Sequence, residues 1–309
     1  MHVFRRPSPH IVLLIGLLAV SSASIFIRYA QAEATPSLVI AAMRLSLAAL
    51  MLTPFALRQP NRQHLSELSP RQKGLAVLAG VFLAFHFAFW ITSLEHVSVL
   101  ISVVLVTTSP LWVALLSPVL LKEPLQKKTV VGIVLAFVGG VLVSAGGQAI
   151  LPTMDASPLL GSLLSILGAL AVAFYIIIGR HIRATVPVVP YTWLTYSAAA
   201  LTLLMMVLVS GQQLIGYSNR VYLWLLLLAV FPQAIGHTSF NYALGSLPAA
   251  YVSLVILGEP VASAILAFIL LGETPTAIQL AGSALILFAV LQARQQTPPV
   301  RSPAPNLAD

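Results

Sequence analysis

Long apolar segments, separated by short polar stretches, recur along the whole chain. Each segment holds about 20 residues, enough for an α-helix to cross a hydrocarbon layer roughly 30 Å thick. The pattern predicts ten transmembrane helices, at residues 11–29, 36–57, 74–93, 97–121, 129–146, 158–179, 190–210, 221–242, 248–271 and 276–293. The sequence therefore predicts an all-α integral membrane protein.

A second pattern emerges when the chain is aligned with itself at an offset of 150 residues. Matching pairs include Leu94 with Leu244, Pro110 with Pro260, Glu123 with Glu273 and Gly132 with Gly282. Leucine matches are expected by chance in so apolar a chain, but proline, glutamate and glycine matches at one ungapped offset are not. At an offset of 152, Gly16–Val20 also resembles Gly168–Val172. The pattern indicates an internal duplication, with five helices in residues 1–150 and five in residues 151–309.

The odd number of helices in each half decides how the halves relate to the membrane. After five crossings the chain lies on the opposite side, so the second half enters the membrane in the inverted orientation. Inverted repeats are the architecture of many secondary transporters, which bind substrate near the bilayer midplane between the repeats. We therefore expect ten transmembrane helices arranged as two inverted five-helix repeats around a central site.

Basic residues are distributed unevenly between the segments that join the helices. With the N-terminus in the cytoplasm, the cytoplasmic segments hold 13 of the 16 basic residues: Arg5, Arg6, Arg58, Arg62, Arg71, Lys73, Lys122, Lys127, Lys128, Arg180, Arg183, Arg294 and Arg301. Cytoplasmic segments of membrane proteins carry this excess of lysine and arginine. The bias predicts that both termini are cytoplasmic.

The first helix has an alternative interpretation as a cleaved signal peptide. Two arginines, an apolar run and the small residues 21–24 fit that layout. We prefer an uncleaved helix because the apolar run continues through Ile25–Ile27, and because cleavage would disrupt both the charge bias and the duplication.

Composition agrees with a membrane protein and excludes other classes. Hydrophobic residues make up 59% of the chain and charged residues 8%, and the mean hydropathy is +0.96, far from the values of a soluble domain. The absence of cysteine excludes disulfides, thiolate catalysis and cysteine-based metal sites. The net charge of +8 is explained by topology, so we expect no nucleic-acid partner.

Several short motifs together resemble a known family. They are Pro36 followed by Arg44, Leu121-Lys-Glu-Pro124, Asn241-Tyr-Ala-Leu244, Leu247-Pro-Ala-Ala250, Glu259-Pro260 and Leu271-Gly-Glu273. Across residues 11–293 the chain resembles the EamA family of the drug/metabolite transporter superfamily. The resemblance implies ten helices in two five-helix repeats, and an exporter of amino acids or other small metabolites in the bacterial inner membrane. It does not identify the cargo.

The two halves differ at the residues that carry charge within the predicted helices. Ser109 precedes the proline of the first half, whereas Glu259 precedes the proline of the second. Arg44 has no basic counterpart, since Ala198 is its approximate equivalent.

Glu259 is the main candidate for a functional side chain. It lies about 16 Å along its helix at 1.5 Å per residue, near the midplane. An intramembrane carboxylate is unfavourable and indicates a functional site. It would bind a substrate ammonium or carry a coupling proton; alternatively it is structural, paired with Arg44 or with a backbone group freed by Pro260.

Arg44 has three interpretations. Its guanidinium is suited to a substrate carboxylate, it is a counter-ion for Glu259, or it extends outward to the membrane interface. We prefer the counter-ion interpretation. Both the substrate-binding and the counter-ion interpretations predict that Arg44 faces the interior of the bundle.

Further polar and aromatic residues are candidates for a substrate site. Gln233, His237 and Asn241 share one helix face at four-residue spacing, and His86 and Trp90 do the same in the matching helix. Hydrogen bonding between helices is the alternative for these faces. Trp112, Tyr175 and Tyr251 are aromatic candidates for the wall of a cavity, and Pro110 and Pro260 are candidate hinges. The hydroxyls of Ser21, Ser22, Ser24, Thr107, Thr108 and Ser109 either face a cargo or bond to their own helices.

No motif for catalysis, metal binding or nucleotide binding is present in the sequence. We therefore expect no enzyme activity, no cofactor, no metal and no nucleotide-binding subunit; the expected partners are a small-molecule substrate and the lipid bilayer. The sequence predicts a secondary transporter that exports small metabolites such as amino acids and that rocks residues 1–150 against residues 151–309 in alternating access. The alternatives are a passive channel or facilitator and, less favoured, an intramembrane enzyme or receptor.

Overall fold

The computed structural model describes residues 7–97, 99–145, 157–259, 261–262, 265–266 and 274–294, and these residues form helices and no strand. In the first half the helices are α1 (Pro9–Val20), α2 (Ala23–Ala32), α3 (Ser37–Ala56), α4 (Asn61–Glu67), α5 (Pro70–His96), α6 (Val99–Val106), α7 (Ser109–Leu120) and α8 (Lys127–Ala145). In the second half they are α9 (Pro158–Arg183), α10 (Val188–Ser210), α11 (Asn219–Leu228), η1 (Ala229–His237), α12 (Thr238–Leu244), α13 (Ala249–Ile256) and α15 (Ala277–Arg294).

Six helical segments within these ranges are long and apolar enough to cross a membrane. They are Pro9–Ala32, Ser37–Ala56, Pro70–His96, Pro158–Arg183, Val188–Ser210 and Asn219–Leu244, and each overlaps one predicted span. Shorter apolar helices cover Val104–Leu120 and Ala277–Gln292. Many large apolar side chains, such as Val119, Leu201 and Leu208, are exposed on the outer surface, as suits contact with lipid. The chain is a multi-pass membrane protein.

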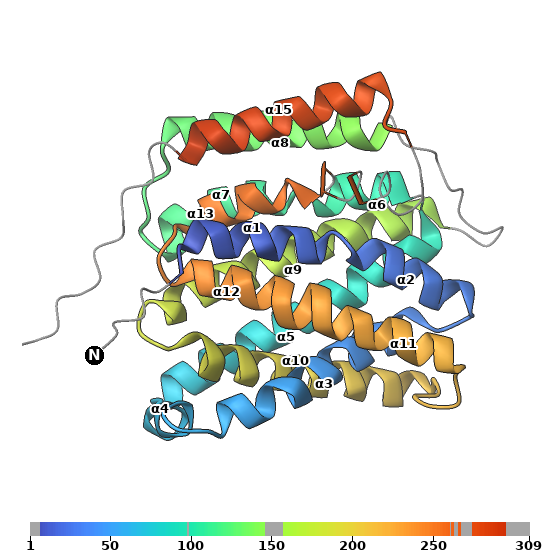
Figure 1. The fold of residues 1–309 in the computed structure, drawn as a ribbon, viewed down its shortest axis with the longest axis vertical. Coiled ribbons are helices and arrows are strands. Elements are labelled where there is room, and N and C mark those ends of the chain that lie inside the picture. Colours follow the sequence, from blue (N-terminus) through green and yellow to red (C-terminus); the bar gives the residue numbers. More distant parts are fainter. Residues whose placement is uncertain are drawn as a thin grey trace, which may run out of the picture.

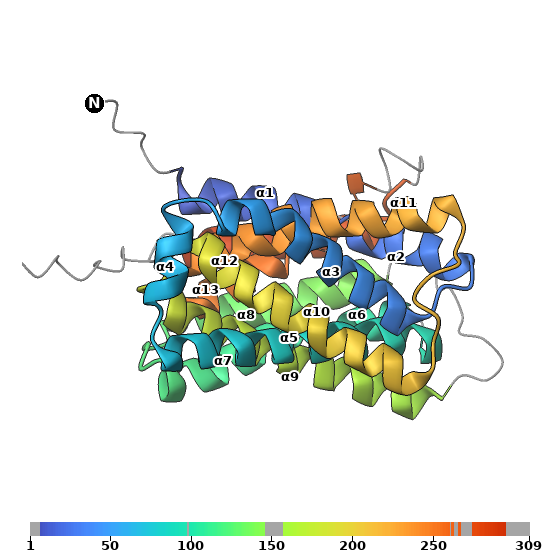
Figure 2. The ribbon, with the colours of Figure 1, turned by 90° about the horizontal axis from the view of Figure 1, so that it is seen from below.

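The long helices lie alongside one another in a bundle, with α4 and the N-terminus of α13 at one end and α2 and α6 at the other (Figures 1 and 2). Helix α5 packs along α9, and α3 packs along α10. Helix α1 packs along η1 and α12, and α10 also contacts α5. Helices α8 and α15 pack against each other at one edge of the bundle (Figure 1).

The pairing of α8 with α15 depends on two glycines. A Cβ atom added to Gly139 would lie 2.7 Å from the carbonyl oxygen of Gly282, and one added to Gly282 would lie 2.6 Å from the carbonyl oxygen of Gly139. Only residues without a side chain allow the two backbones to approach so closely, as is common between membrane helices.

Two of the predicted spans are interrupted near their centres. Helices α1 and α2 are separated at Ser21–Ser22, and the Ser21 hydroxyl donates a hydrogen bond to the Leu17 carbonyl at 2.7 Å. Helices α6 and α7 are separated at Thr107–Thr108, and Pro110 lies in the first turn of α7. Local hydroxyl bonds compete with helix bonds, and proline lacks the N–H group of a continuing helix. Both interruptions therefore follow from the local sequence.

A third span contains a π-helix. Segments α11, η1 and α12 form one continuous helix, in which Ala229–His237 have π geometry around Pro232. Such wide turns arise where a helix hydrogen bond cannot form, and they are frequent at functional sites. The segment carries Gln233 and His237, two of the predicted site residues.

A buried ion pair joins the two halves of the chain near one end of the bundle. Arg180, at the end of α9, places Nε 2.6 Å from Glu123 Oε1, and its Nη1 donates to the Leu244 carbonyl at 3.0 Å. The other carboxylate oxygen of Glu123 accepts a bond from the Ala249 N–H at 3.4 Å. The segment after α7 is thus tied to the ends of α9 and α12 and to the start of α13.

Candidate functional site

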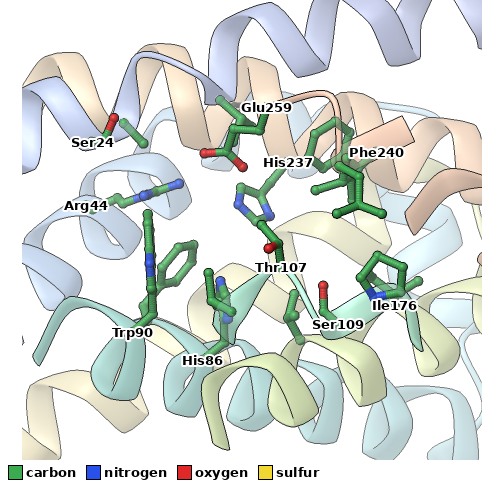
Figure 3. Close-up of a pocket in the computed structure, with 18 residues that line it drawn as sticks. Ser24, Arg44, His86, Trp90, Thr107, Ser109, Ile176, His237, Phe240 and Glu259 are labelled. Atoms are coloured by element: carbon green, nitrogen blue, oxygen red, sulfur yellow. The ribbon is translucent and has the colours of Figure 1, made fainter. Parts of the chain in front are cut away.

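A cavity of about 200 Å³ lies among helices from both halves of the chain, as Figure 3 shows. It is lined by Val20, Ala23, Ser24, Arg44, His86, Phe87, Trp90, Val106, Thr107, Ser109, Pro110, Val172, Ile176, His237, Phe240, Ile256, Leu257 and Glu259. Both helix interruptions and the end of the π-helix contribute to this wall. The lining is mostly apolar with a few polar groups, which is typical of sites for small molecules.

Arg44 is held in place by two residues on different helices. Its side chain is completely buried on α3, and Nε donates a hydrogen bond to Gln233 Oε1 at 2.8 Å. Its Cζ lies 4.2 Å from the centre of the Phe87 ring, in a cation–π contact. Within the described part of the chain, Nη1 and Nη2 have no hydrogen-bond partner.

Glu259 follows the end of α13 and points into the same space as Arg44 (Figure 3). Among the described residues the ion pairs are His64–Glu67 and Arg180–Glu123, so no direct ion pair joins Glu259 to Arg44. The Glu259 carbonyl accepts a hydrogen bond from the Ser21 hydroxyl at 3.3 Å, which links it to the break between α1 and α2.

Two histidines and a tryptophan complete the polar part of the wall. His86 Nδ1 lies 2.9 Å from the Gly168 carbonyl. A carbonyl only accepts, so Nδ1 carries the proton and Nε2 is the acceptor in the neutral ring. His86 stacks on Trp90 with an angle of 12° between the rings, and His237 meets Phe87 edge-on at 5.3 Å. Trp90 Nε1 and His237 Nδ1 are buried and have no partner among the residues that the structure describes.

Five of the ten predicted binding residues therefore line this cavity: Arg44, His86, Trp90, His237 and Glu259. The candidate hinge Pro110 also lines it. The second candidate hinge, Pro260, lies outside the described residues.

The other five predicted binding residues are not part of this wall. Gln233 Oε1 accepts a hydrogen bond from Arg44 Nε at 2.8 Å, and Asn241 Oδ1 accepts one from the Tyr175 hydroxyl at 2.8 Å. Trp112 donates to the Thr108 hydroxyl at 3.3 Å. Tyr251 lies near the end of the bundle, where its ring meets His10 edge-on. These polar groups bond within the bundle instead of facing the cavity.

The cavity also contains residues that the sequence analysis did not single out, and the offset of 150 relates several of them. Five pairs of cavity residues have this spacing: Phe87 and His237, Trp90 and Phe240, Val106 and Ile256, Thr107 and Leu257, and Ser109 and Glu259. Two further pairs are 152 residues apart: Val20 with Val172 and Ser24 with Ile176. The duplication was thus a signal that could have identified Phe87 and Phe240 from His237 and Trp90.

Within the described ranges, no group of three or more histidine or acidic side chains could hold a metal ion. The cavity combines one cation, one carboxylate, two imidazoles and aromatic surfaces. It is equipped to bind a small molecule that is partly polar and partly apolar.

A multi-pass helical protein with such a cavity has the features of a membrane transporter. Residues 8–145 and, separately, residues 159–293 match the model of the EamA-like transporter family. The chain belongs to this family, as its motifs had suggested.

Similar proteins carry transporter names. A protein of Archaeoglobus fulgidus, named an uncharacterized transporter, is 25% identical over 279 residues, which cover 90% of this chain and 93% of that protein. YedA of Escherichia coli K12, named an uncharacterized inner membrane transporter, is 26% identical over 291 residues, covering 93% and 91%. A solved crystal structure superimposes with a TM-score of 0.76 at 18% identity, covering 94% of this chain and 98% of that chain, and so has the same fold.

Proposed function

We propose that the protein is a secondary transporter that exports a small, partly apolar metabolite, such as an amino acid, by alternating access. In this proposal residues 1–150 and 151–309 are two inverted five-helix repeats that rock about the cavity. Pro110 and Pro260 are the bending points, and the protein lies in a bacterial inner membrane with both termini in the cytoplasm. The Escherichia coli relative is named an inner membrane transporter, which supports that location.

The observation that carries the proposal is the paired origin of the cavity wall. Residues 150 positions apart, such as Trp90 and Phe240 or Ser109 and Glu259, meet around one cavity. A site between two inverted repeats becomes accessible from either side when the repeats exchange conformations. A wall built from equivalent positions of both halves is what this mechanism requires.

Helix packing supports the same relation between the halves. The contact of α5 with α9 corresponds to the contact of α1 with η1 and α12, because the duplication pairs α5 with the α11–η1–α12 helix and α9 with the first helix. The glycines face equivalent positions: Gly16 approaches Gly236 and Phe240, and Gly168 approaches His86 and Trp90, which lie 150 residues before them. The two separate family matches divide the chain at the same place.

Glu259 is assigned the central role in this proposal, either in binding the cargo or in carrying a coupling proton. It is the carboxylate on the wall of the cavity, and a carboxylate inside a membrane-spanning bundle is costly unless it has a function or a partner. We expect Glu259→Gln to abolish transport in proteoliposomes while the thermal unfolding midpoint stays near that of the wild type. The amide keeps the shape of the side chain and removes its charge.

The matched control is Glu67→Gln, which makes the same change on the exposed helix α4 and should transport normally. Loss of folded protein in the Glu259 variant would instead indicate a structural carboxylate. Normal transport by a folded Glu259→Gln variant would remove Glu259 from the mechanism.

A further inference from the structure

The two terminal nitrogens of Arg44 are the most unusual feature of the cavity wall. A guanidinium has five N–H donors, and the residues that the structure describes use only the one on Nε. The remaining four are completely buried, and buried polar groups are nearly always hydrogen-bonded. The wall therefore contains unsatisfied donors of a fixed positive group.

Contacts with Gln233 and Phe87 fix the orientation of the Arg44 guanidinium and therefore the direction of its Nη1 and Nη2 N–H groups. The Gln233 amide oxygen binds Nε, and the Phe87 ring covers one face of the guanidinium plane. Two fixed contacts on one planar group leave only its Nη1–Nη2 edge free. Figure 3 shows the end of the Arg44 side chain directed into the cavity, beside Glu259.

Another unsatisfied donor belongs to Trp90, a residue of the same cavity wall. Trp90 Nε1 is buried and has no partner in the described ranges, and an indole N–H can only donate. The nearby Glu259 does not bond to Arg44 in this conformation. Arg44 and Trp90 thus carry N–H groups that no described residue accepts, and a bound molecule with anionic oxygens would satisfy them.

We propose that Arg44 and Trp90 form an oxyanion subsite for a carboxylate-bearing cargo, and that Gln233 and Phe87 are positioning residues that direct the free edge of Arg44 toward it. The subsite binds a cargo only if the protein is a transporter, so this inference rests on the proposed function. Binding at the subsite is nevertheless measurable without transport. A planar carboxylate matches the two parallel N–H groups of a guanidinium edge. Gln233 acts through Arg44 and does not touch the cargo.

The test uses chemical modification of arginine in the full-length protein reconstituted in liposomes. The reagent p-hydroxyphenylglyoxal attacks free guanidinium edges, and mass spectrometry measures its reaction at Arg44. Arg180 is the internal comparison, because it is also buried but is bonded to Glu123 and to the Leu244 carbonyl. Three probes of similar size are compared as protectors: leucine, 4-methylpentanoate and leucinamide, which lacks a carboxylate.

We expect Arg44, whose terminal nitrogens are unbonded, to react faster than Arg180 whenever the cavity opens, and leucine and 4-methylpentanoate, each at about ten times its dissociation constant, to slow that reaction on the order of tenfold. Leucinamide should not slow it. Gln233→Glu should place a carboxylate on Arg44 and remove this discrimination between acid and amide. The control Gln213→Glu adds the same charge at an exposed position and should behave as the wild type.

If the Gln233 variant does not fold, the wild-type protein alone tests the proposal, through the rate of Arg44 modification relative to Arg180 and its protection by the three probes. An Arg44 that reacts no faster than Arg180, or that is protected equally by all three probes or by none, would overturn it. Protection without any counterflow of leucine would leave the subsite standing and refute the transport function. Saturable counterflow of a probe without protection of Arg44 would support the transport function and refute the subsite.

Discussion

At the scale of single residues, the ion pair between Arg180 and Glu123 connects the two halves of the chain. Arg180 is buried and Glu123 is 24% exposed, so the pair is largely removed from water. Removing one partner of such a pair leaves the other charge without compensation, which costs more than the pair contributes when intact.

We expect Arg180→Met to lower the free energy of unfolding by about 3 kcal/mol, because it leaves the Glu123 carboxylate unpaired. Glu123→Gln should cost less, about 1–2 kcal/mol, since a neutral amide still accepts a hydrogen bond from Arg180. Unfolding in detergent, compared with the exposed control Arg220→Met, measures both. Equal stability of the Arg180 and Arg220 variants would contradict the assigned role.

The candidate site could be predicted from the sequence only in part. Charge and polarity within apolar segments identified Arg44 and Glu259, since such residues rarely face lipid. The same argument could not distinguish Gln233 and Asn241, which bond to Arg44 and Tyr175, from residues that line the cavity. Inward-facing polar groups satisfy one another before they face a cavity, and their partners lie on other helices that the sequence does not reveal.

At the scale of helices, the matched glycines Gly16 and Gly168 have different surroundings. A Cβ atom at Gly16 would lie 2.7 Å from the Ser239 Cβ and 3.0 Å from the Gly236 carbonyl oxygen. At Gly168 the nearest atom would be the Trp90 backbone nitrogen at 3.4 Å, an ordinary contact. The two positions correspond in the duplication, but neighbouring atoms lie closer to Gly16 than to Gly168.

We predict opposite effects for the two alanine substitutions. Gly16→Ala should destabilise by about 1–3 kcal/mol, because α1 would have to move away from η1 and α12. Gly168→Ala should be neutral or stabilise by up to about 1 kcal/mol, because alanine favours the helix. Unfolding of the two variants side by side tests this, and equal losses at both positions would contradict the packing.

The positions of the six long helices were predictable because apolar length alone specifies a membrane crossing. The breaks at Ser21–Ser22 and Thr107–Thr108 and the π-helix at Ala229–His237 were not predicted. Proline and hydroxyl residues indicate where a helix is weak, but they occur in continuous membrane helices too. Whether a helix breaks, widens or bends depends on the neighbours that can satisfy its free backbone groups.

At the scale of the whole molecule, the duplication links the sequence to the cavity. Offsets of 150 and 152 relate the motifs, the glycine contacts and the paired residues of the cavity wall. A carrier that rocks two related halves accounts for these features together, whereas a passive channel does not require paired walls.

The most direct test of this account is substrate counterflow in proteoliposomes that contain the wild-type protein. Vesicles loaded with an unlabelled solute are diluted into a trace of the labelled one, across amino acids, purine nucleosides and cationic drugs. A carrier should accumulate label transiently against its gradient and should saturate with concentration. Uptake that never saturates and never exceeds equilibrium, for a solute that the protein admits, would contradict the account and indicate a channel.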